Sequence, residues 1–323
     1  MNKIFTFKPY LKTVVWGGDK IKQFKGIDTD QCNIGESWEI SGVPGHESIV
    51  ESGEDEGLNI TELIEKYGAD IVGEDVYKRF GNMFPLLIKI IDARDNLSVQ
   101  VHPDDNLARR RHNSPGKTEM WYVIDADLDA NIISGLSQAI TPDEYRRRVA
   151  DNSITEVLAN HKSHPGDVFF LPAGRIHAIG GGNLIAEIQQ TSDITYRVYD
   201  YDRRGLDGKP RQLHVEEAVD AIDYKVYDNY VTDYDRDAKG EVPLVGCQYF
   251  DVQKVAVDGQ LSLHHTSESF VVLMCIGGHC IVDVDREAAC NMSRGQTVLV
   301  AASARSVTIT GNAVLVAASV PRG

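Results

Sequence analysis

Short apolar runs separated by turn-forming residues dominate the middle of the chain. These runs are rich in β-branched and aromatic residues and are bounded by Gly, Asn, Asp and Pro, a pattern typical of strands. They are FPLLIKIIDA (84–93), LSVQVH (97–102), EMWYVIDA (119–126), NIISGL (131–136), DVFFLPAG (167–174), NLIAEIQQ (183–190) and TYRVYDYD (195–202). Short strands at this density predict a mainly β protein built as an antiparallel barrel or sandwich.

Helical spacing of apolar residues is confined to four short segments. LNITELIEKYG (58–68) predicts one short helix, and TPDEYRRRVADN (141–152) predicts another, because Thr141, Pro142 and Glu144 form a capping box with proline in the first turn. SITEVLANH (153–161) and LHVEEAVDAIDY (213–224) predict two more. We therefore expect small helical insertions at about 58–80 and 141–160.

A second group of strands follows the acidic segment DYDRDAKGEVP (233–243), which has the composition of a linker. The later strands are YFDVQKVAV (249–257), ESFVVLMCI (268–276), HCIVDVD (279–285), QTVLVA (296–301), RSVTIT (305–310) and AVLVAAS (313–319). This arrangement predicts two β domains, at residues 1–228 and 240–323.

Composition places the chain among globular proteins. Its 323 residues are 42% hydrophobic, enough for the cores of roughly two domains. The five cysteines contain no C-x-x-C pair, which favours reduced thiols over a disulfide framework. Because we find neither a signal-peptide pattern nor a stretch of about 18 apolar residues, we expect a cytoplasmic protein without membrane partners.

The net charge of −15 argues against nonspecific binding of nucleic acid or anionic lipid, which need a positive field. The PGKT sequence at 115–118 resembles the end of a phosphate-binding loop, but Arg111 occupies the position of its first glycine. A small anionic substrate is compatible with this charge only if a few cations, or a metal, reverse the potential locally.

One segment carries the spacing of a metal-binding barrel. Gly166, Pro172, Gly174 and His177 match G-x5-P-x-G-x2-H, the second motif of the cupin barrels. The motif ends one strand at a turn and places the histidine at the start of the next. A single histidine after a turn is more often structural than a ligand, so its interpretation depends on other candidate donors.

Three such donors precede it in the sequence. Gln100 and His102 are two residues apart, so in a strand both side chains lie on the same face. Glu119 begins the strand EMWYVIDA, where the first cupin motif carries a carboxylate. Gln100, His102, Glu119 and His177 together offer mixed nitrogen and oxygen donors with an open position, which suits zinc and, less strictly, iron, manganese or cobalt. Individually, Gln100 also fits a buried hydrogen-bonding role and Glu119 a solvated strand end.

Five blocks in order resemble the type I mannose-6-phosphate isomerases, in particular their short bacterial form with two cupin domains. The blocks are GESWEISG (35–42), LLIKIIDARDNLSVQVHPDD (86–105), GKTEMWYV (116–123), LPAGRIHAIG (171–180) and QTSDITYRVYDYDR (190–203). The resemblance implies two jelly-roll β-barrels and the zinc-dependent interconversion of mannose 6-phosphate and fructose 6-phosphate. It also implies that Gln100, His102, Glu119 and His177 hold one zinc ion per chain and that Arg197 is an active-site residue.

The isomerisation moves a proton between C1 and C2 through a cis-enediol, so the site needs a proton carrier and stabilisation of a developing oxyanion. Lys117 is two residues before Glu119 and points into the same cavity in an extended chain. Arg197 follows Asp193 by four residues, and we expect the two to orient each other while the guanidinium stabilises negative charge. The general base and the phosphate-binding residues stay unassigned.

The second domain lacks most of the second cupin motif. Aligned from Gly295, the proline position is Ala301, the glycine position Ser303 and the histidine position Ser306. We therefore expect a degenerate cupin domain without metal at 240–323, whose role is to pack against the first domain.

Two other function classes fit a metal cupin. A noncatalytic, metal-containing sugar-binding cupin would keep the ligands but lose Lys117 or Arg197, and this chain keeps both. The second class is another cupin enzyme, such as a phosphoglucose isomerase or an oxygenase. The Gln and Glu donors and the SDITYR block are less typical of these enzymes. We expect a sugar phosphate as the partner and a monomer or weak homodimer.

Overall fold

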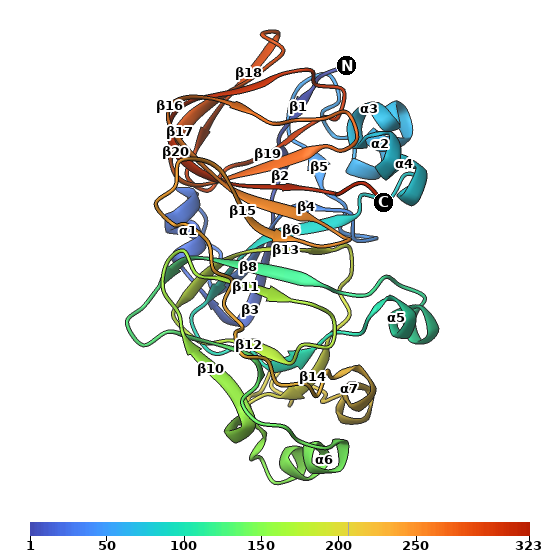
Figure 1. Cartoon of the computed structure of the whole chain (residues 1–323), viewed down its shortest axis with the longest axis vertical. Helices are drawn as coiled ribbons and strands as arrows, with labels where there is room; N and C mark the ends of the chain where they lie inside the picture. Colours follow the sequence, from blue (N-terminus) through green and yellow to red (C-terminus); the bar gives the residue numbers. More distant parts are fainter. Residues whose placement is uncertain (206) are drawn as a thin grey trace.

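The computed structural model describes residues 1–205 and 207–323, and its strands form two stacked units joined near the middle of the molecule (Figure 1). The strands of the N-terminal unit are β2 (Phe7–Lys8), β3 (Tyr10–Gly18), β4 (Ile34–Ser41), β5 (Ile49–Val50), β6 (Leu86–Ala93), β7 (Val99–Val101), β8 (Glu119–Ala126), β9 (Asn131–Leu136), β10 (Leu158–Lys162), β11 (Val168–Leu171), β12 (His177–Ile179), β13 (Asn183–Gln190) and β14 (Tyr196–Tyr199). The sequence predicted β8, β9 and β13 with these bounds.

Two sheets of the N-terminal unit face each other. One has six strands in the order β11-β8-β13-β6-β4-β3, and the other has five in the order β10-β9-β12-β7-β14. Their neighbouring strands are antiparallel. Buried apolar residues fill the unit on both sides of these sheets, including Trp121 and Phe169 in one cluster and Tyr145 and Tyr196 in another.

The C-terminal unit is a seven-stranded sheet that also takes up the start of the chain. Its strands are β1 (Ile4–Phe5), β15 (Gly240–Gly246), β16 (Asp251–Leu263), β17 (Val271–Val284), β18 (Ala288–Ser293), β19 (Thr297–Val300) and β20 (Val307–Ser319). β1 pairs with β19, so the blue N-terminal strand lies among the orange and red strands in Figure 1. Residues 4 and 5 therefore belong to the sheet of the C-terminal half.

Two pairs of strands predicted from the sequence are single long strands. β17 covers most of both ESFVVLMCI and HCIVDVD, and β20 covers most of RSVTIT and all of AVLVAAS. The glycines at the joints do not end the strands: β17 continues through a register shift between Cys275 and Gly277, and Gly311 pairs with Gly259 and Cys280. A glycine inside a strand pattern thus marks a bulge or a close approach of backbones here.

The helices are short and lie around the edges of the sheets. They are α1 (Lys20–Lys25), α2 (Ile60–Tyr67), α3 (Ala69–Val72), α4 (Glu74–Phe80), α5 (Asp105–His112), α6 (Pro142–Ala150) and α7 (Val215–Ala221), with the 3-10 helix η1 (Ile154–Val157). Three of the four predicted helices are confirmed as α2, α6 and α7. At the start of α6, Thr141 accepts a hydrogen bond from the Glu144 backbone N–H, as the capping pattern predicted.

Two local predictions are wrong. The helix predicted over 153–161 is a 3-10 turn followed by strand β10, because the apolar residues of this segment pack beside β9. The linker predicted over 233–243 includes the start of β15, whose edge position tolerates Pro243 beside a register shift.

A shared apolar cluster joins the two units. Helix α2 and the residues before β6 contribute Ile60, Leu63 and Phe84, while the C-terminal unit contributes Phe250 and Phe270. The ring centroids of Phe84 and Phe270 are 4.7 Å apart. The contact is apolar and fully buried, as expected of a stable domain interface.

All five cysteines are free. Among the described residues, no helix is long and apolar enough to cross a bilayer.

Candidate metal centre and active-site cavity

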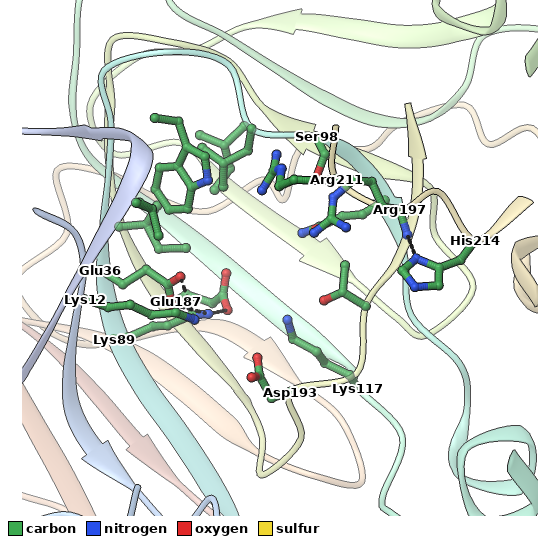
Figure 2. A pocket seen from close by; sticks show the side chains of 17 residues that line it. Lys12, Glu36, Lys89, Ser98, Lys117, Glu187, Asp193, Arg197, Arg211 and His214 are labelled. Carbon is green, nitrogen blue, oxygen red and sulfur yellow. Dashed lines mark hydrogen bonds and ion pairs between the residues drawn. The ribbon is translucent and has the colours of Figure 1, made fainter. Parts of the chain in front are cut away.

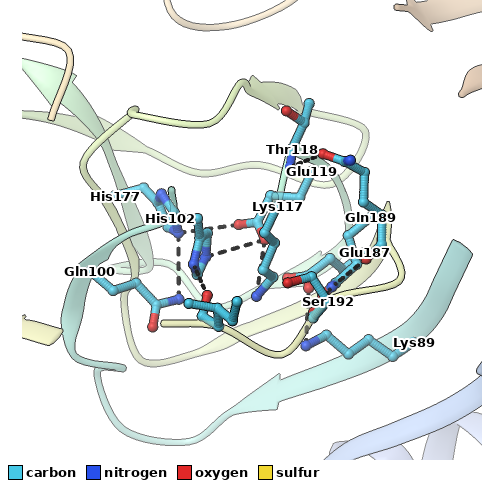
Figure 3. A network of polar contacts seen from close by, with 12 residues as sticks. Lys89, Gln100, His102, Lys117, Thr118, Glu119, His177, Glu187, Gln189 and Ser192 are labelled. Atoms are coloured by element: carbon cyan, nitrogen blue, oxygen red, sulfur yellow. Dashed lines mark hydrogen bonds and ion pairs between the residues drawn. The ribbon is translucent and has the colours of Figure 1, made fainter. Parts of the chain in front are cut away.

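Three of the four predicted metal ligands meet between the two N-terminal sheets. His102 directly follows β7 and His177 begins β12 in the five-stranded sheet, whereas Glu119 begins β8 in the six-stranded sheet. One donor atom from each lies within 4.8 Å of the others. His102 Nε2 is 3.5 Å from Glu119 Oε2, and His177 Nε2 is 3.1 Å from Glu119 Oε1 (Figure 3).

The cupin motif positions both histidines through backbone contacts. Gly174 adopts a φ of 91°, which favours glycine, and its N–H donates to the carbonyl of His102 at 2.9 Å. The turn before β12 is thereby tied to the end of β7. His177 is the register partner of Gln100 on β7, which brings the two motifs side by side.

The outer nitrogen of each imidazole is fixed by a carbonyl. His102 Nδ1 lies 2.8 Å from the carbonyl oxygen of Ile194, and His177 Nδ1 lies 2.7 Å from that of Arg175. Because a carbonyl only accepts, each Nδ1 carries the proton and each Nε2 presents a lone pair. This second-sphere arrangement is characteristic of histidines that bind metal.

Three of the inner polar atoms lack hydrogen-bond partners among the described residues. His102 Nε2 and both carboxylate oxygens of Glu119 are buried without one. Buried polar atoms rarely remain unpaired, so a nitrogen lone pair beside an unsatisfied carboxylate fits a divalent cation. The side-chain amide nitrogen of Gln100 lies 3.4 Å from His177 Nε2, which places the fourth predicted ligand beside the three.

Protonation also suits a metal site. Burial works to raise the pKa of Glu119, but the charge of Lys117 holds it well below its ordinary value. Burial and the charge of Lys117 lower the pKa of His102. A carboxylate and a neutral imidazole are the forms that bind metal.

A cavity of about 370 Å³ opens beside this centre (Figure 2). Trp16, Leu97 and Ile179 contribute apolar surface to it. Its charged lining consists of five cationic side chains, Lys12, Lys89, Lys117, Arg197 and Arg211, and three carboxylates, Glu36, Glu187 and Asp193. The cations outnumber the carboxylates in a chain whose net charge is −15, so the lining favours a small anion.

The three predicted catalytic residues all line this cavity but occupy different parts of it. Lys117 is buried, and its Nζ lies 3.3 Å from Glu119 Oε2. Asp193 is exposed and lies on the same side of the cavity as Lys117 (Figure 2). Among the described residues, no ion pair links Asp193 to Arg197, so the mutual orientation expected from their spacing is not present.

Arg197 is held by backbone rather than by a carboxylate. Its Nη1 donates to the carbonyl oxygen of Gln212 at 2.9 Å, and its Nε is buried without a hydrogen-bond partner in the part of the chain that the structure describes. Its own backbone N–H donates to His214 Nδ1 at 3.1 Å. Burial and the nearby charge of Arg211 lower the pKa of Arg197, although the charge of Asp200 opposes this effect.

Sequence reasoning missed a charged network on the floor of the cavity. Lys89 Nζ lies 3.3 Å from Glu36 Oε2 and 3.0 Å from Glu187 Oε1. Lys89 and Glu187 are register partners on β6 and β13, and Trp121 Nε1 donates to Glu187 Oε2 at 2.7 Å. The signal was available, since Lys89 and Glu187 each stand within an apolar run and buried charges are almost always paired.

Comparison with known families identifies relatives of this chain. Residues 4–142 match the catalytic domain of type I phosphomannose isomerase, and residues 241–320 match the cupin domain of mannose-6-phosphate isomerase. The chain is 37% identical over 275 residues to mannose-6-phosphate isomerase ManA of Bacillus subtilis, covering 84% of this chain and 85% of the relative. It is 36% identical over 280 residues to the mannose-6-phosphate isomerase of Streptococcus mutans, covering 85% of each.

Solved structures give the same result. The crystal structure of mannose 6-phosphate isomerase from Bacillus subtilis superimposes with a TM-score of 0.88 at 32% identity, over 98% of this chain and 99% of that one. Phosphomannose isomerase from Salmonella typhimurium, at 17% identity and a TM-score of 0.80, shares the fold. These matches confirm the predicted mainly β cupin fold.

Proposed function

The chain belongs to the type I phosphomannose isomerase family and is an aldose-ketose isomerase of mannose 6-phosphate, and from this premise we propose which residues hold the metal and which act on the sugar. One observation carries the proposal. The donor atoms of His102, Glu119 and His177 converge from two sheets within 4.8 Å of one another, beside a cavity lined by an excess of cations.

We propose that Gln100, His102, Glu119 and His177 hold one zinc ion. Imidazole nitrogens and carboxylate or amide oxygens suit zinc, and the resemblance to the family implies the same metal. When bound, the ion would polarise the oxygens on C1 and C2 of the sugar. The carbonyls of Ile194 and Arg175 support this assignment because they keep both Nε2 atoms available.

The side chains around the cavity have distinct proposed roles in isomerisation through a cis-enediol. Arg197, which lacks a carboxylate partner in the described structure, stabilises the negative charge that develops on the sugar oxygens. Lys117 lies beside Glu119 and donates to a sugar oxygen from the buried side of the cavity. Asp193, an exposed residue of the same cavity lining, orients the substrate or carries a proton.

We propose that the catalytic domain covers residues 1–228 and that the cupin domain at 240–323 holds no metal. The second proposal is supported by the residues at the motif positions, where Ser306 replaces the histidine. The Ser306 backbone N–H and hydroxyl both bond to Asp285, which gives this position a structural role. Location in the cytoplasm and a monomer or weak homodimer stay predictions from the sequence.

A coupled assay with mannose 6-phosphate tests the proposal. Purified enzyme should form fructose 6-phosphate, lose the activity on treatment with a chelator, and regain it when zinc is restored. The His102→Ala variant should lose both metal and activity. Chelator-insensitive turnover, or full metal occupancy in His102→Ala, would refute the metal assignment.

The alternative function, a noncatalytic sugar-binding cupin, predicts a different result in the same assay. Such a protein would bind mannose 6-phosphate in calorimetry without producing fructose 6-phosphate at any metal concentration. The buried Lys117 and the Arg197 side chain favour the enzyme because both face the cavity.

A further inference from the structure

One tyrosine of the C-terminal unit contacts the segment that carries Lys117. Tyr249 lies in the turn between β15 and β16, and its hydroxyl donates to Asp105 Oδ2 at 2.7 Å. Asp105 is the first residue of α5 in the N-terminal unit. This hydrogen bond therefore joins the two units close to the end of β7.

Asp105 in turn holds the backbone on both sides of Lys117. Its Oδ1 accepts from the N–H of Gly116 at 2.8 Å and from the side-chain amide of Gln190 at 3.1 Å. The amide oxygen of Gln190 accepts from the N–H of Thr118 at 2.9 Å. The residues before and after Lys117 are thus fixed by a connected set of side chains.

The remaining backbone contacts of this segment are also satisfied. The N–H of Lys117 donates to the carbonyl of Pro103 at 3.1 Å, and the N–H of Gln190 donates to the carbonyl of Thr118 at 3.1 Å. A Cβ on Gly116 would lie 2.6 Å from the backbone of Asp105, so the segment packs directly on the start of α5. The position of the Lys117 side chain is therefore coupled to that of α5.

The charge of Asp105 strengthens these contacts. Burial works to raise the pKa of Asp105, but hydrogen bonds from Tyr249, Gly116 and Gln190 lower it below its ordinary value. An ionised acceptor binds these donors more strongly than a neutral one would.

We propose that Tyr249, Asp105 and Gln190 form a positioning relay through which the C-terminal unit holds Lys117 in its catalytic place. The inference rests on the proposed role of Lys117. It gives the second unit a function in turnover in addition to packing. A displacement of about 1 Å at a catalytic group can cost on the order of 100-fold in rate, so the relay need only limit a small movement.

Steady-state kinetics on Tyr249→Phe, Asp105→Ala and Asp105→Asn tests the relay. We expect kcat to fall about threefold to tenfold in Tyr249→Phe and more than tenfold in Asp105→Ala, with KM and metal content unchanged. Asp105→Asn should restore most of the activity, because its side chain can accept from Gly116 and Gln190 and donate to Tyr249.

Tyr234→Phe is the matched control. The Tyr234 hydroxyl also donates to the N-terminal unit, here to the backbone carbonyl of Gly166 at 2.7 Å, and among the described residues it has no hydrogen bond to the Lys117 segment. Its removal should change thermal stability by an amount similar to that of Tyr249→Phe and leave kcat unchanged.

A double-mutant experiment shows whether the relay acts through Lys117. On the Lys117→Met background, Tyr249→Phe should cause no further loss of kcat. Equal kcat in Tyr249→Phe, Tyr234→Phe and wild type, or an undiminished effect of Tyr249→Phe on the Lys117→Met background, would overturn the relay. Wild-type turnover in Lys117→Met alone would instead refute the proposed role of Lys117. If Asp105→Ala does not fold, Tyr249→Phe and its control decide the result.

Discussion

Replacing Arg197 by alanine should slow turnover strongly while leaving the metal in place. Its guanidinium faces the cavity, is held by the Gln212 carbonyl and lacks a carboxylate partner among the described residues. A full charge about 4 Å from a developing oxyanion contributes about 4 kcal/mol at an effective dielectric constant of 20. This corresponds to about 10³-fold in rate. Because Arg197 is partly exposed, solvent screening reduces the expected loss of kcat to about 10²- to 10³-fold.

The assay is the coupled isomerase assay, combined with metal analysis of the same preparation. Arg203→Ala is the control, because Arg203 is also a partly buried arginine but is not among the residues that line the cavity. Its guanidinium contacts Asp200 and the carbonyl of Asn96. It should keep kcat within about threefold of wild type. An unchanged kcat in Arg197→Ala would refute its role in charge stabilisation, and loss of metal from that variant would show that Arg197 acts on the metal site instead.

Three further predictions concern metal affinity, acid stability and packing. Gln100→Ala should weaken zinc binding about tenfold or more in chelator competition, and an unchanged affinity would remove Gln100 from the ligand set. Burial opposes ionisation of Glu36, but Lys89 and other donors lower its pKa from 4.5 to about 2. Ionised Glu36 therefore stabilises the folded state above pH 4.5, and this contribution is lost as the pH falls towards 2. We expect the free energy of unfolding to fall by about 3 kcal/mol over this pH range in the wild type, and denaturant unfolding of Glu36→Gln should not show this decrease. The same decrease in Glu36→Gln would contradict the role of Glu36. Gly73→Ala should lower the free energy of unfolding by about 3 kcal/mol in urea titrations, because Gly73 has a φ of 96° and its Cβ would lie 2.1 Å from the carbonyl oxygen of Glu268. Wild-type stability would show that this contact between the units relaxes freely.

Local patterns in the sequence were sufficient for most strands of the N-terminal unit. Strands β8, β9 and β13 were predicted residue by residue because each is an apolar run ended by turn residues. The long strands β17 and β20 were not, since the glycines within them resemble turns until the partner strands are known. Helix α5 was missed because its eight residues carry only two buried side chains, Leu107 and Ala108.

The metal-site candidates were accessible from the sequence because their spacing follows a motif. Gln100 and His102 share a strand face, and the glycine and proline before His177 define a turn. The cavity network of Lys89, Glu187 and Glu36 depends on register between strands far apart in the chain. The spacing of Asp193 and Arg197 suggested a pair, but the cavity separates their side chains. Register and side-chain direction are set by tertiary packing, which the spacing of residues along the chain does not specify.

The most direct test is anomalous diffraction from crystals of the active enzyme, measured on both sides of the zinc absorption edge. The proposal predicts one strong peak per chain, at roughly 2.0–2.2 Å from His102 Nε2, His177 Nε2 and a carboxylate oxygen of Glu119. An active crystal with no peak between these three side chains, or with its only peak in the C-terminal unit, would contradict the proposed metal centre.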